Sequence, residues 1–500
     1  MIKSRLLFGI SLLLQLVLSI GCTPAQAKQP NIVFILTDDL DQGVFKHLTA
    51  IDDRIHRLIG AQGATFYNSF VSVAVCSPSR ASIFRGQLAH NTGIYTNYSY
   101  DKFYADGREN STVATWLQAA GYRTALIGNY FNTYPNPGAA THIPPGWNHW
   151  IVPNGGYWYD QFNYSLNENG VTVYYGDASA DYFVDVLSNK AAAFINYTVT
   201  RFPAKPFFLY ISPTVPHHPG TPAPRYAYND MLPNVRAPRT ASFNEADVSD
   251  KPAWIQSTPR LTSAQIGEMD YLYRNRLLSM KAVADLVENL INTLRAKGEL
   301  ANTYIFFGSD NGFHQGQHRI DSGKNTAYDE DLRVPLEVRG PGIAPGTLLG
   351  PIVANIDYAP TWADIAGVTP PEFVDGRSLL PLLRGSPPSN WRKALLLEHR
   401  SEIFFREAGA TSDSKMFIGP PVNFVGLRTK DQAFAGVGPI AYVEYGSGER
   451  EYYNMVNDPN QLRNNYSEVS PVLKAKLHTW LGTMLHGAGK SLRDAEQTPP

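Results

Sequence analysis

Cys76 is the side chain with the clearest chemical potential in this sequence. It opens the run Cys76-Ser77-Pro78-Ser79-Arg80, in which serine suits the N-cap of a helix and proline suits the first helical position. The run predicts that Cys76 lies just before a helix, where backbone N–H groups and the helix dipole attract anions. Arg80, in the first turn, adds a permanent positive charge. These features favour a nucleophile beside an oxyanion site, although a lone cysteine is also common as a small buried hydrophobe.

Side chains that suit a hard divalent cation follow two apolar runs of the chain. Asp38 and Asp39 come directly after the first run, and Asp310 and Asn311 come soon after the second. Because Ca²⁺ takes about six to eight oxygen ligands, these four side chains could supply several of them. Taken singly, each pair is equally typical of a solvated turn or a helix cap.

The elements that must position these side chains alternate along the chain. Apolar runs separated by helical periodicity predict an α/β fold, in which a mainly parallel sheet is covered on both faces. Sites in such sheets gather at the carboxyl ends of the strands, where both acidic pairs and the segment 216–219 would meet. The predicted strands are Asn31–Thr37, Tyr122–Ile127, Pro206–Ile211, Thr303–Gly308 and Val334–Val338, and the predicted helices are Thr112–Ala120, Asp181–Ile195 and Leu261–Ala296.

The character of the chain changes after the linker at residues 385–389. We expect a catalytic domain over residues 28–384 and a smaller α+β domain over residues 390–490. Short strands at Ala394–Glu398 and Ala441–Tyr445 and a helix over Pro471–Met484 would build the smaller domain. The polar tail, residues 491–500, is expected to lack ordered structure.

Residues 1–27 are typical of an export signal. Basic residues precede an apolar run over 6–20, and small residues at 25–27 suit a signal peptidase. We expect a periplasmic or secreted protein, or a lysosomal one in a eukaryotic host, with Cys22 as a candidate for lipid attachment. No later run is long enough to span a bilayer. Loss of the leader would leave Cys76 as the only cysteine, so no internal disulfide could form.

The charge balance argues against a nucleic-acid partner. The chain has 43 Lys and Arg residues against 44 Asp and Glu residues, so it lacks the basic excess that phosphate binding requires. With 43% hydrophobic and 17% charged residues, the composition indicates a globular protein.

The run CSPSRAS resembles the signature of the type I sulfatases, in which the cysteine is converted to formylglycine after translation. The resemblance also covers NIVFILTDDLD, HNTG, VPHHP, FFGSDNGFHQGQH, VPLEVRGPGI and EYYNMVNDPNQLRN. The stretches IGNYFN, PPGW, NYSLNENG and VANIDYAPT look most like the N-acetylglucosamine-6-sulfatase branch. On these motifs the chain is identified as a member of this family.

The resemblance implies an alkaline-phosphatase-like α/β/α sandwich with a smaller C-terminal α+β domain. It implies formylglycine made from Cys76 by a formylglycine-generating enzyme or an equivalent. The hydrated aldehyde would attack sulfur, and its second hydroxyl would later let sulfate leave. By matching position, the ligands of Ca²⁺, with Mg²⁺ as a second candidate, would be Asp38, Asp39, Cys76, Asp310 and Asn311. The residues around the nucleophile and the sulfate would be Arg80, His217 as general acid, and Lys324.

Two positions depart from the family pattern. Asn129 stands where the family usually has a lysine that contacts sulfate, and loss of that charge would weaken transition-state stabilisation by roughly a few kcal/mol. Arg85 replaces a common threonine and could supply the missing charge. We treat Asn129, His314 and His318 as candidate substrate-binding residues.

The sequence therefore predicts an exported, Ca²⁺-dependent sulfuric ester hydrolase that acts on a sulfated carbohydrate or an aryl sulfate. One alternative is a formylglycine-dependent phosphodiester or phosphonate monoester hydrolase, which shares the nucleophile motif. Another is a sulfated-glycan-binding protein with weakened catalysis, which the asparagine at position 129 motivates.

Overall fold

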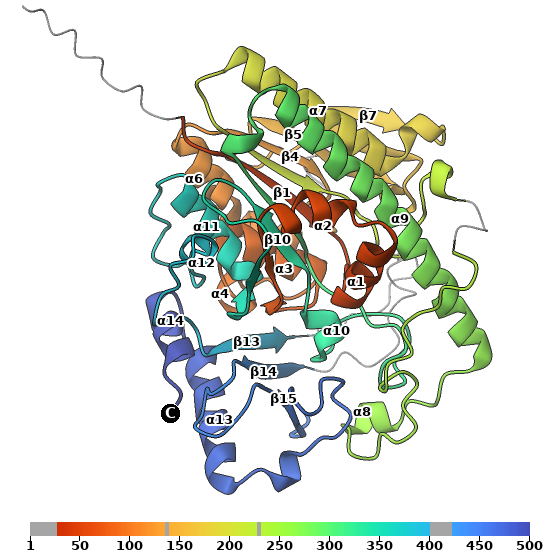
Figure 1. The fold of residues 1–500 in the computed structure, drawn as a ribbon, viewed down its shortest axis with the longest axis vertical. Coiled ribbons are helices and arrows are strands. Elements are labelled where there is room, and N and C mark those ends of the chain that lie inside the picture. The colour runs from red at the N-terminus through yellow and green to blue at the C-terminus, as the bar shows by residue number, and fades with distance from the viewer. Residues whose placement is uncertain (1–27, 136–139, 228–231, 401–422) are drawn as a thin grey trace, which may run out of the picture.

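A ten-stranded sheet forms the centre of the molecule (Figure 1). The computed structural model describes residues 28–135, 140–227, 232–400 and 423–500, so the predicted leader and Cys22 lie outside the described residues. The strand order is β11-β2-β10-β9-β1-β8-β4-β5-β6-β7. In that order the strands are Thr347–Leu349, Ala64–Phe66, Leu336–Arg339, Thr303–Ser309, Asn31–Thr37, Phe207–Ser212, Arg123–Gly128, His149–Gly156, Tyr164–Glu168 and Val171–Tyr175.

The five strands β9, β1, β8, β4 and β5 run parallel to one another at the centre of the sheet. On either side of them, β10 runs antiparallel to β9 and β6 runs antiparallel to β5. The outer strands β2 and β7 are antiparallel to β10 and β6, and β11 is parallel to β2, so these three run in the same direction as the central five. The sheet is thus mainly parallel, as predicted, with β10 and β6 running in the opposite direction.

Alternate residues of the central strand β1 face two separate hydrophobic cores. Ile32 and Phe34 pack into one core, whereas Val33 and Ile35 pack into the other. A strand buried on both faces needs apolar residues at every position, which explains its continuous apolar run. The result is an α/β/α sandwich, and the fold prediction is confirmed.

Helices on the two faces complete these cores. The first face carries α3 (Cys76–Arg85), α6 (Val113–Ala119) and α11 (Tyr358–Ile365). The second face carries α1 (Gln42–Ile51), α7 (Phe183–Arg201) and the long α9 (Ser263–Ala296). Among the described residues, no helix has the length and apolar character that a membrane crossing requires.

A second, four-stranded antiparallel sheet lies below the main sheet in Figure 1. Its strands are β13 (Ala394–His399), β14 (Phe424–Thr429), β15 (Ile440–Tyr445) and β16 (Arg450–Asn454). Helix α13 (Pro471–Leu485) packs on it, in agreement with the predicted α+β character.

The expectation of a disordered tail is wrong. Residues Lys490–Gln497 form helix α14, whose Leu492 is fully buried in the core of the smaller sheet. Its Glu496 is also buried and pairs with Arg392 at 3.2 Å. The other polar residues of the helix are exposed or partly exposed, so its polar sequence is that of a surface helix anchored by Leu492 and Glu496.

Candidate active site

The predicted acidic pairs meet at the carboxyl ends of the central strands. Asp38 and Asp39 follow β1, Asp310 follows the neighbouring β9, and all three side chains are fully buried. Asp39 adopts the left-handed conformation, with φ 64°, and its N–H donates to Asp310 Oδ1 over 3.2 Å. Candidate ligand atoms of Asp38, Asp39, Cys76 and His217 lie within 4.8 Å of one another.

Cys76 is the first residue of α3, and not the residue before it as predicted. The N-cap is Val75, while Ser77 lies inside the helix and donates from its Oγ to Asn132 Oδ1 over 2.7 Å. The Cys76 side chain is fully buried, and its Sγ lies 2.7 Å from Lys324 Nζ. Burial raises the pKa of the Cys76 thiol well above its ordinary value, and the Asp38 carboxylate raises it further, although Lys324 opposes both. Without a bound cation, this environment favours the thiol over the nucleophilic thiolate.

Arg80 holds the carboxylates in place. Its side chain is fully buried, and its Nε donates to Asp310 Oδ2 over 2.9 Å, while Nη2 donates to Asp38 Oδ2 over 3.0 Å. Nη1 donates to Ser212 Oγ over 2.7 Å and to the backbone oxygen of Asn129 over 2.9 Å. The guanidinium therefore fixes the ends of the four central strands β9, β1, β8 and β4 relative to one another.

Lys324 bridges the nucleophile and the acidic cluster. Its Nζ donates to Asp39 Oδ1 over 2.6 Å as well as to Cys76 Sγ. The loop that carries it is held by an antiparallel bridge between His314 and Gly323. A lysine in this position places a positive charge directly beside the reacting atom.

The donor set fits a hard divalent cation. Asp39 Oδ2 and Asn311 Oδ1 are buried and have no hydrogen-bond partner among the described residues. Burial and the nearby Asp38 carboxylate raise the pKa of Asp310 to about 7, against the opposing effects of Arg80 and Lys324. Three buried carboxylates face the buried Arg80 and the partly buried Lys324, and a divalent ion with oxygen ligands would both balance the charge and satisfy the orphaned oxygens.

His217 lies beside the acidic cluster, next to Asp39. Its Nδ1 is 2.8 Å from the backbone oxygen of His218, so this nitrogen carries a proton. Its Nε2 is 3.6 Å from Asp39 Oδ2. The ring centroid is 4.5 Å from that of Tyr159. This arrangement leaves Nε2 as the ring nitrogen that faces the site.

Asn129 is part of the site, but as a neutral group. It is buried, and its Nδ2 donates to Asp38 Oδ2 over 3.0 Å and to the Tyr159 hydroxyl over 3.2 Å. Arg85 does not replace the missing charge, because its guanidinium donates to two backbone oxygens at residues 108 and 111 and lies 4.3 Å from the Phe373 ring.

The other two histidines have different surroundings. His314 is buried, with Nδ1 2.8 Å from Asp331 Oδ1, and its backbone supports the loop of Lys324. His318 is fully buried with Nδ1 2.7 Å from Glu245 Oε2, and it stacks on Tyr328 at 4.1 Å. The ring of His314 therefore pairs with Asp331 and only its backbone is tied to the Lys324 loop, while the ring of His318 has partners outside the acidic cluster.

Several residues that organise the site carry no sequence motif. Tyr159 accepts from Asn129 and Asn132, and buried Arg276 of α9 donates to the backbone oxygens of Asp39 and Pro216. An arginine within an apolar helical stretch is the only signal that could have drawn attention to position 276.

Comparisons with known proteins identify the family. The sulfatase family profile matches residues 30–368. The chain is 35% identical over 493 residues to human N-acetylglucosamine-6-sulfatase, covering 94% of this chain and 87% of the relative. It is 31% identical over 515 residues to an arylsulfatase of Volvox carteri, covering 94% of this chain and 76% of the relative.

Solved structures share the same architecture. One is described as a complex with its substrate D-glucosamine-2-N,6-O-disulfate; it is 25% identical, with a TM-score of 0.69, covering 94% of this chain and 99% of its own. A phosphonate monoester hydrolase from Silicibacter pomeroyi is 22% identical, with a TM-score of 0.65, covering 93% and 97% of the two chains, and shows the fold alone. Because the family profile covers more than half of the chain and the human relative is similar over nearly all of it, this protein belongs to the sulfatase family and is a sulfuric ester hydrolase.

Proposed function

We propose that this sulfatase releases sulfate from a sulfated amino sugar, with formylglycine at position 76 and Ca²⁺ in the acidic cluster. The observation that carries the proposal is the environment of Cys76. Its buried Sγ lies 2.7 Å from Lys324 Nζ, beside carboxylates whose oxygens include a buried atom without a hydrogen-bond partner among the described residues. The raised pKa of the thiol supports a modified side chain as the nucleophile.

The ligands of the cation would be Asp38, Asp39, Asp310, Asn311 and the modified side chain at position 76. A bound Ca²⁺ supplies positive charge that polarises a sulfate oxygen, and formylglycine supplies a hydrated aldehyde as the nucleophile. Mg²⁺ is the second candidate for the same oxygen-rich site.

The chain's own cations and histidine have distinct tasks in this proposal. Lys324 stabilises negative charge on the nucleophilic side chain and on the sulfate, because its Nζ already contacts Sγ. Arg80 is a positioning residue, since its donors bond to Asp38, Asp310, Ser212 and a backbone oxygen. His217 protonates the leaving alcohol from Nε2, the ring nitrogen that faces the site.

The substrate class rests on the relatives. The human relative is named for a glucosamine sulfated at position 6, and the solved complex holds a glucosamine sulfated at O6. Both support such a sugar as the substrate here. We further propose that residues 1–27 direct export and that the catalytic and smaller domains span residues 28–384 and 390–490.

Mass spectrometry tests the nucleophile. We expect the peptide that contains Cys76, from protein made in a host with formylglycine-generating activity, to be lighter by about 18 Da than the unmodified peptide. The same sample should release sulfate from N-acetylglucosamine 6-sulfate and from an aryl sulfate. Hydrolysis of a phosphonate monoester in preference to both sulfate esters would favour the alternative, a phosphodiester or phosphonate monoester hydrolase. An unmodified thiol with sugar binding but no turnover would favour the binding protein.

Chelation tests the cation site. Removal of divalent ions should abolish sulfate release and lower the melting temperature, because three buried carboxylates would then face only Arg80 and Lys324. Addition of Ca²⁺ should restore both properties. Full activity after exhaustive chelation, verified by elemental analysis, would contradict a metal site.

A further inference from the structure

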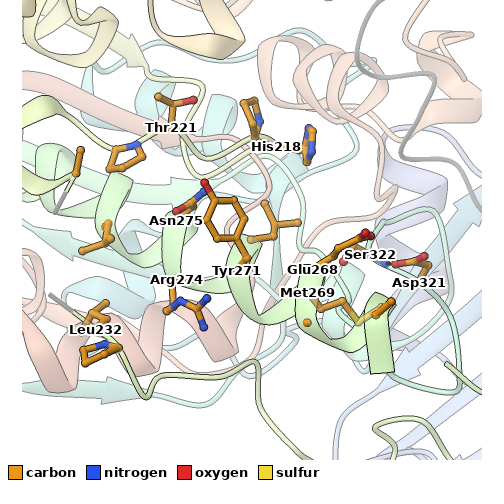
Figure 2. A pocket seen from close by; sticks show the side chains of 18 residues that line it. His218, Thr221, Leu232, Glu268, Met269, Tyr271, Arg274, Asn275, Asp321 and Ser322 are labelled. Atoms are coloured by element: carbon orange, nitrogen blue, oxygen red, sulfur yellow. Dashed lines mark hydrogen bonds between the residues drawn. The ribbon is translucent and has the colours of Figure 1, made fainter. Parts of the chain in front are cut away.

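Two adjacent histidines of the segment 216–219 have different surroundings. His217 is buried and offers a candidate ligand atom to the acidic cluster. His218 lines a cavity of about 1120 Å³ together with Tyr271 and Asn275 of α9 (Figure 2). Among the described residues that line this cavity, none belongs to the acidic cluster. Of the two histidines, His217 is therefore the one that can act on a bound ester, and proton transfer requires its ring to have a defined orientation.

The ring of Tyr159 restricts the rotation of the His217 ring. The χ2 torsion of a histidine has broad energy minima, so a hydrogen bond at one ring nitrogen leaves the plane of the ring poorly defined. In His217 that bond joins Nδ1 to the backbone oxygen of His218 over 2.8 Å. The centroids of the Tyr159 and His217 rings are 4.5 Å apart, and the ring planes meet at 45°. This contact limits the tilt of the imidazole and hence the direction of Nε2.

The main chain around Tyr159 is tied to the loop that carries His217. Tyr159 lies in the short 3₁₀ helix η3 (Trp158–Asp160), which follows β5. The buried amide of Gln161 donates to the backbone oxygen of Tyr159 over 3.2 Å and to Thr214 Oγ1 over 2.8 Å. The backbone oxygen of Thr214 accepts from the N–H of His217 over 3.0 Å. A change of the side chain at position 159 leaves all these contacts in place.

The hydroxyl of Tyr159 contacts a different part of the site. It accepts from Asn129 Nδ2 over 3.2 Å and from Asn132 Nδ2 over 3.1 Å. Asn129 also donates to Asp38 Oδ2, and Asn132 Oδ1 accepts from the hydroxyl of Ser77, the residue that follows the nucleophile position. The hydroxyl therefore supports the groups beside the nucleophile, whereas the ring supports the histidine.

We propose that Tyr159 is a positioning residue that holds the His217 ring for proton donation to the leaving alcohol. In that step the S–O bond of the ester breaks, its electron pair stays on the ester oxygen, and the proton on Nε2 of the imidazolium moves to that oxygen. A neutral alcohol leaves and a neutral imidazole remains. A sugar alcohol needs this proton, because its alkoxide is a poor leaving group, whereas an acidic phenol leaves readily as the phenolate. This inference rests on the proposed function, in which His217 is the general acid.

Two variants separate the ring of Tyr159 from its hydroxyl. Tyr159→Leu removes both groups, and Tyr159→Phe removes the hydroxyl alone. Tyr157→Leu is the matched control, because it removes a tyrosine from the same segment that is 68% exposed. His217→Ala gives the effect of losing the acid itself. For each protein, kcat/KM is measured for N-acetylglucosamine 6-sulfate and for aryl sulfates whose phenols range from 4-nitrophenol to unsubstituted phenol.

The expected result is a loss that depends on the leaving group. Tyr159→Leu should lower kcat/KM by about tenfold or more for the sugar sulfate and by less than about threefold for 4-nitrophenyl sulfate. Its plot of log kcat/KM against the pKa of the leaving phenol should be steeper than that of the wild type. Tyr159→Phe should keep the wild-type slope and lower all values by a similar factor of about two to five. Tyr157→Leu should match the wild type.

A double variant tests whether Tyr159 acts through the histidine. In the His217→Ala background, Tyr159→Leu should add nothing to the slope, because the acid that it positions is already absent. An equal loss on every ester in Tyr159→Leu alone would overturn the inference, since general damage to the site has no preference among leaving groups. A further steepening of the slope in the double variant would also overturn it.

The same series separates this inference from the proposed function. If His217→Ala steepens the slope and Tyr159→Leu does not, the inference fails and the role of His217 stands. If His217→Ala leaves the slope unchanged, the proposed general acid is wrong and the inference fails with it. The aryl sulfates need no sugar, so a failure to hydrolyse N-acetylglucosamine 6-sulfate would contradict only the proposed substrate, and a steeper slope in Tyr159→Leu would still support the inference.

Discussion

At the scale of single residues, the active site is a balance of buried charges. Asp38, Asp39 and Asp310 are fully buried and face Arg80 and Lys324. Each carboxylate is held by at least one charged or amide donor, as buried charges require. Position 129, where the family usually has a lysine, contributes a neutral amide to this cluster. The site therefore has less positive charge than the family pattern implies.

The charge at position 129 can be changed with little change in size. Asn129→Asp would place a fourth carboxylate where the amide now donates to Asp38 Oδ2 over 3.0 Å. We expect kcat/KM for an aryl sulfate to fall by at least about hundredfold, because the new charge repels both Asp38 and the sulfate. Asn129→Leu removes the hydrogen bond without adding charge, so its kcat/KM should fall less than that of Asn129→Asp. Equal losses in the two variants would show that the hydrogen bond, and not the charge, matters.

At the scale of elements, the last helix is tied to the main domain through buried ions. Glu496 of α14 accepts from Arg392 Nε at 3.2 Å and also pairs with Arg377. Arg392 is fully buried and donates to both oxygens of Asp357, at 2.5 and 2.7 Å. These pairs join the segments around residues 357 and 392 to the C-terminal helix.

Loss of the carboxylate in α14 should therefore destabilise the protein. Glu496→Gln leaves the buried Arg392 and the partly buried Arg377 facing one carboxylate, and we expect the free energy of unfolding to fall by about 3 kcal/mol or more. Urea denaturation measures the change. Asp494→Asn is the matched control in the same helix, because its partner Lys490 and Asp494 are both exposed and such pairs contribute little. A small loss in Glu496→Gln would mean that α14 is not held by this network.

At the scale of the whole molecule, His90 joins three parts of the chain. It lies in the short helix α4 (Ala89–Thr92), with Nδ1 3.2 Å from Glu398 Oε1 of β13 and Nε2 3.1 Å from the backbone oxygen of Gly487. Burial alone would lower the pKa of His90, but the Glu398 carboxylate and, more weakly, Asp375 hold it above the usual 6.5. The protonated imidazole thus stabilises the contact between the domain of the ten-stranded sheet and the domain of the four-stranded sheet.

This contact should make stability depend on pH. The pKa of His90 is higher in the folded state than in the unfolded state. Its contribution to the free energy of unfolding is therefore complete below the unfolded-state pKa and is lost as pH rises through the folded-state pKa. The difference in unfolding free energy between the wild type and His90→Gln should be largest near about pH 5.5 and should shrink toward about pH 9. Urea titrations across this range measure it. A difference that grows with pH would show that the imidazole acts in its neutral form.

Four of the five central strands were predictable because each is apolar on both faces. The predicted bounds of β1 match the structure, those of β9 differ by one residue at the C-terminal end, and those of β8 differ by one residue at each end. The central strand β5 was not predicted, nor were the outer strands β2, β11 and β7, which are short or largely exposed and lack a continuous apolar run. The direction of β10 depends on its pairing with β9, which no local pattern encodes.

The family, the candidate nucleophile Cys76 and the acidic pairs can be read from residue types at close spacing. Which distant groups contact these side chains depends on the fold of the whole chain. Tyr159 meets Asn129, Arg276 supports Asp39, and Arg85 contacts backbone oxygens away from the acidic cluster. The contact of Tyr159 depends on where the chain turns after β5. The contacts of Arg276 and Arg85 depend on how α9 and α3 pack on the sheet. Such contacts join residues far apart in the chain, and their formation follows from burial of the whole core and not from local pattern.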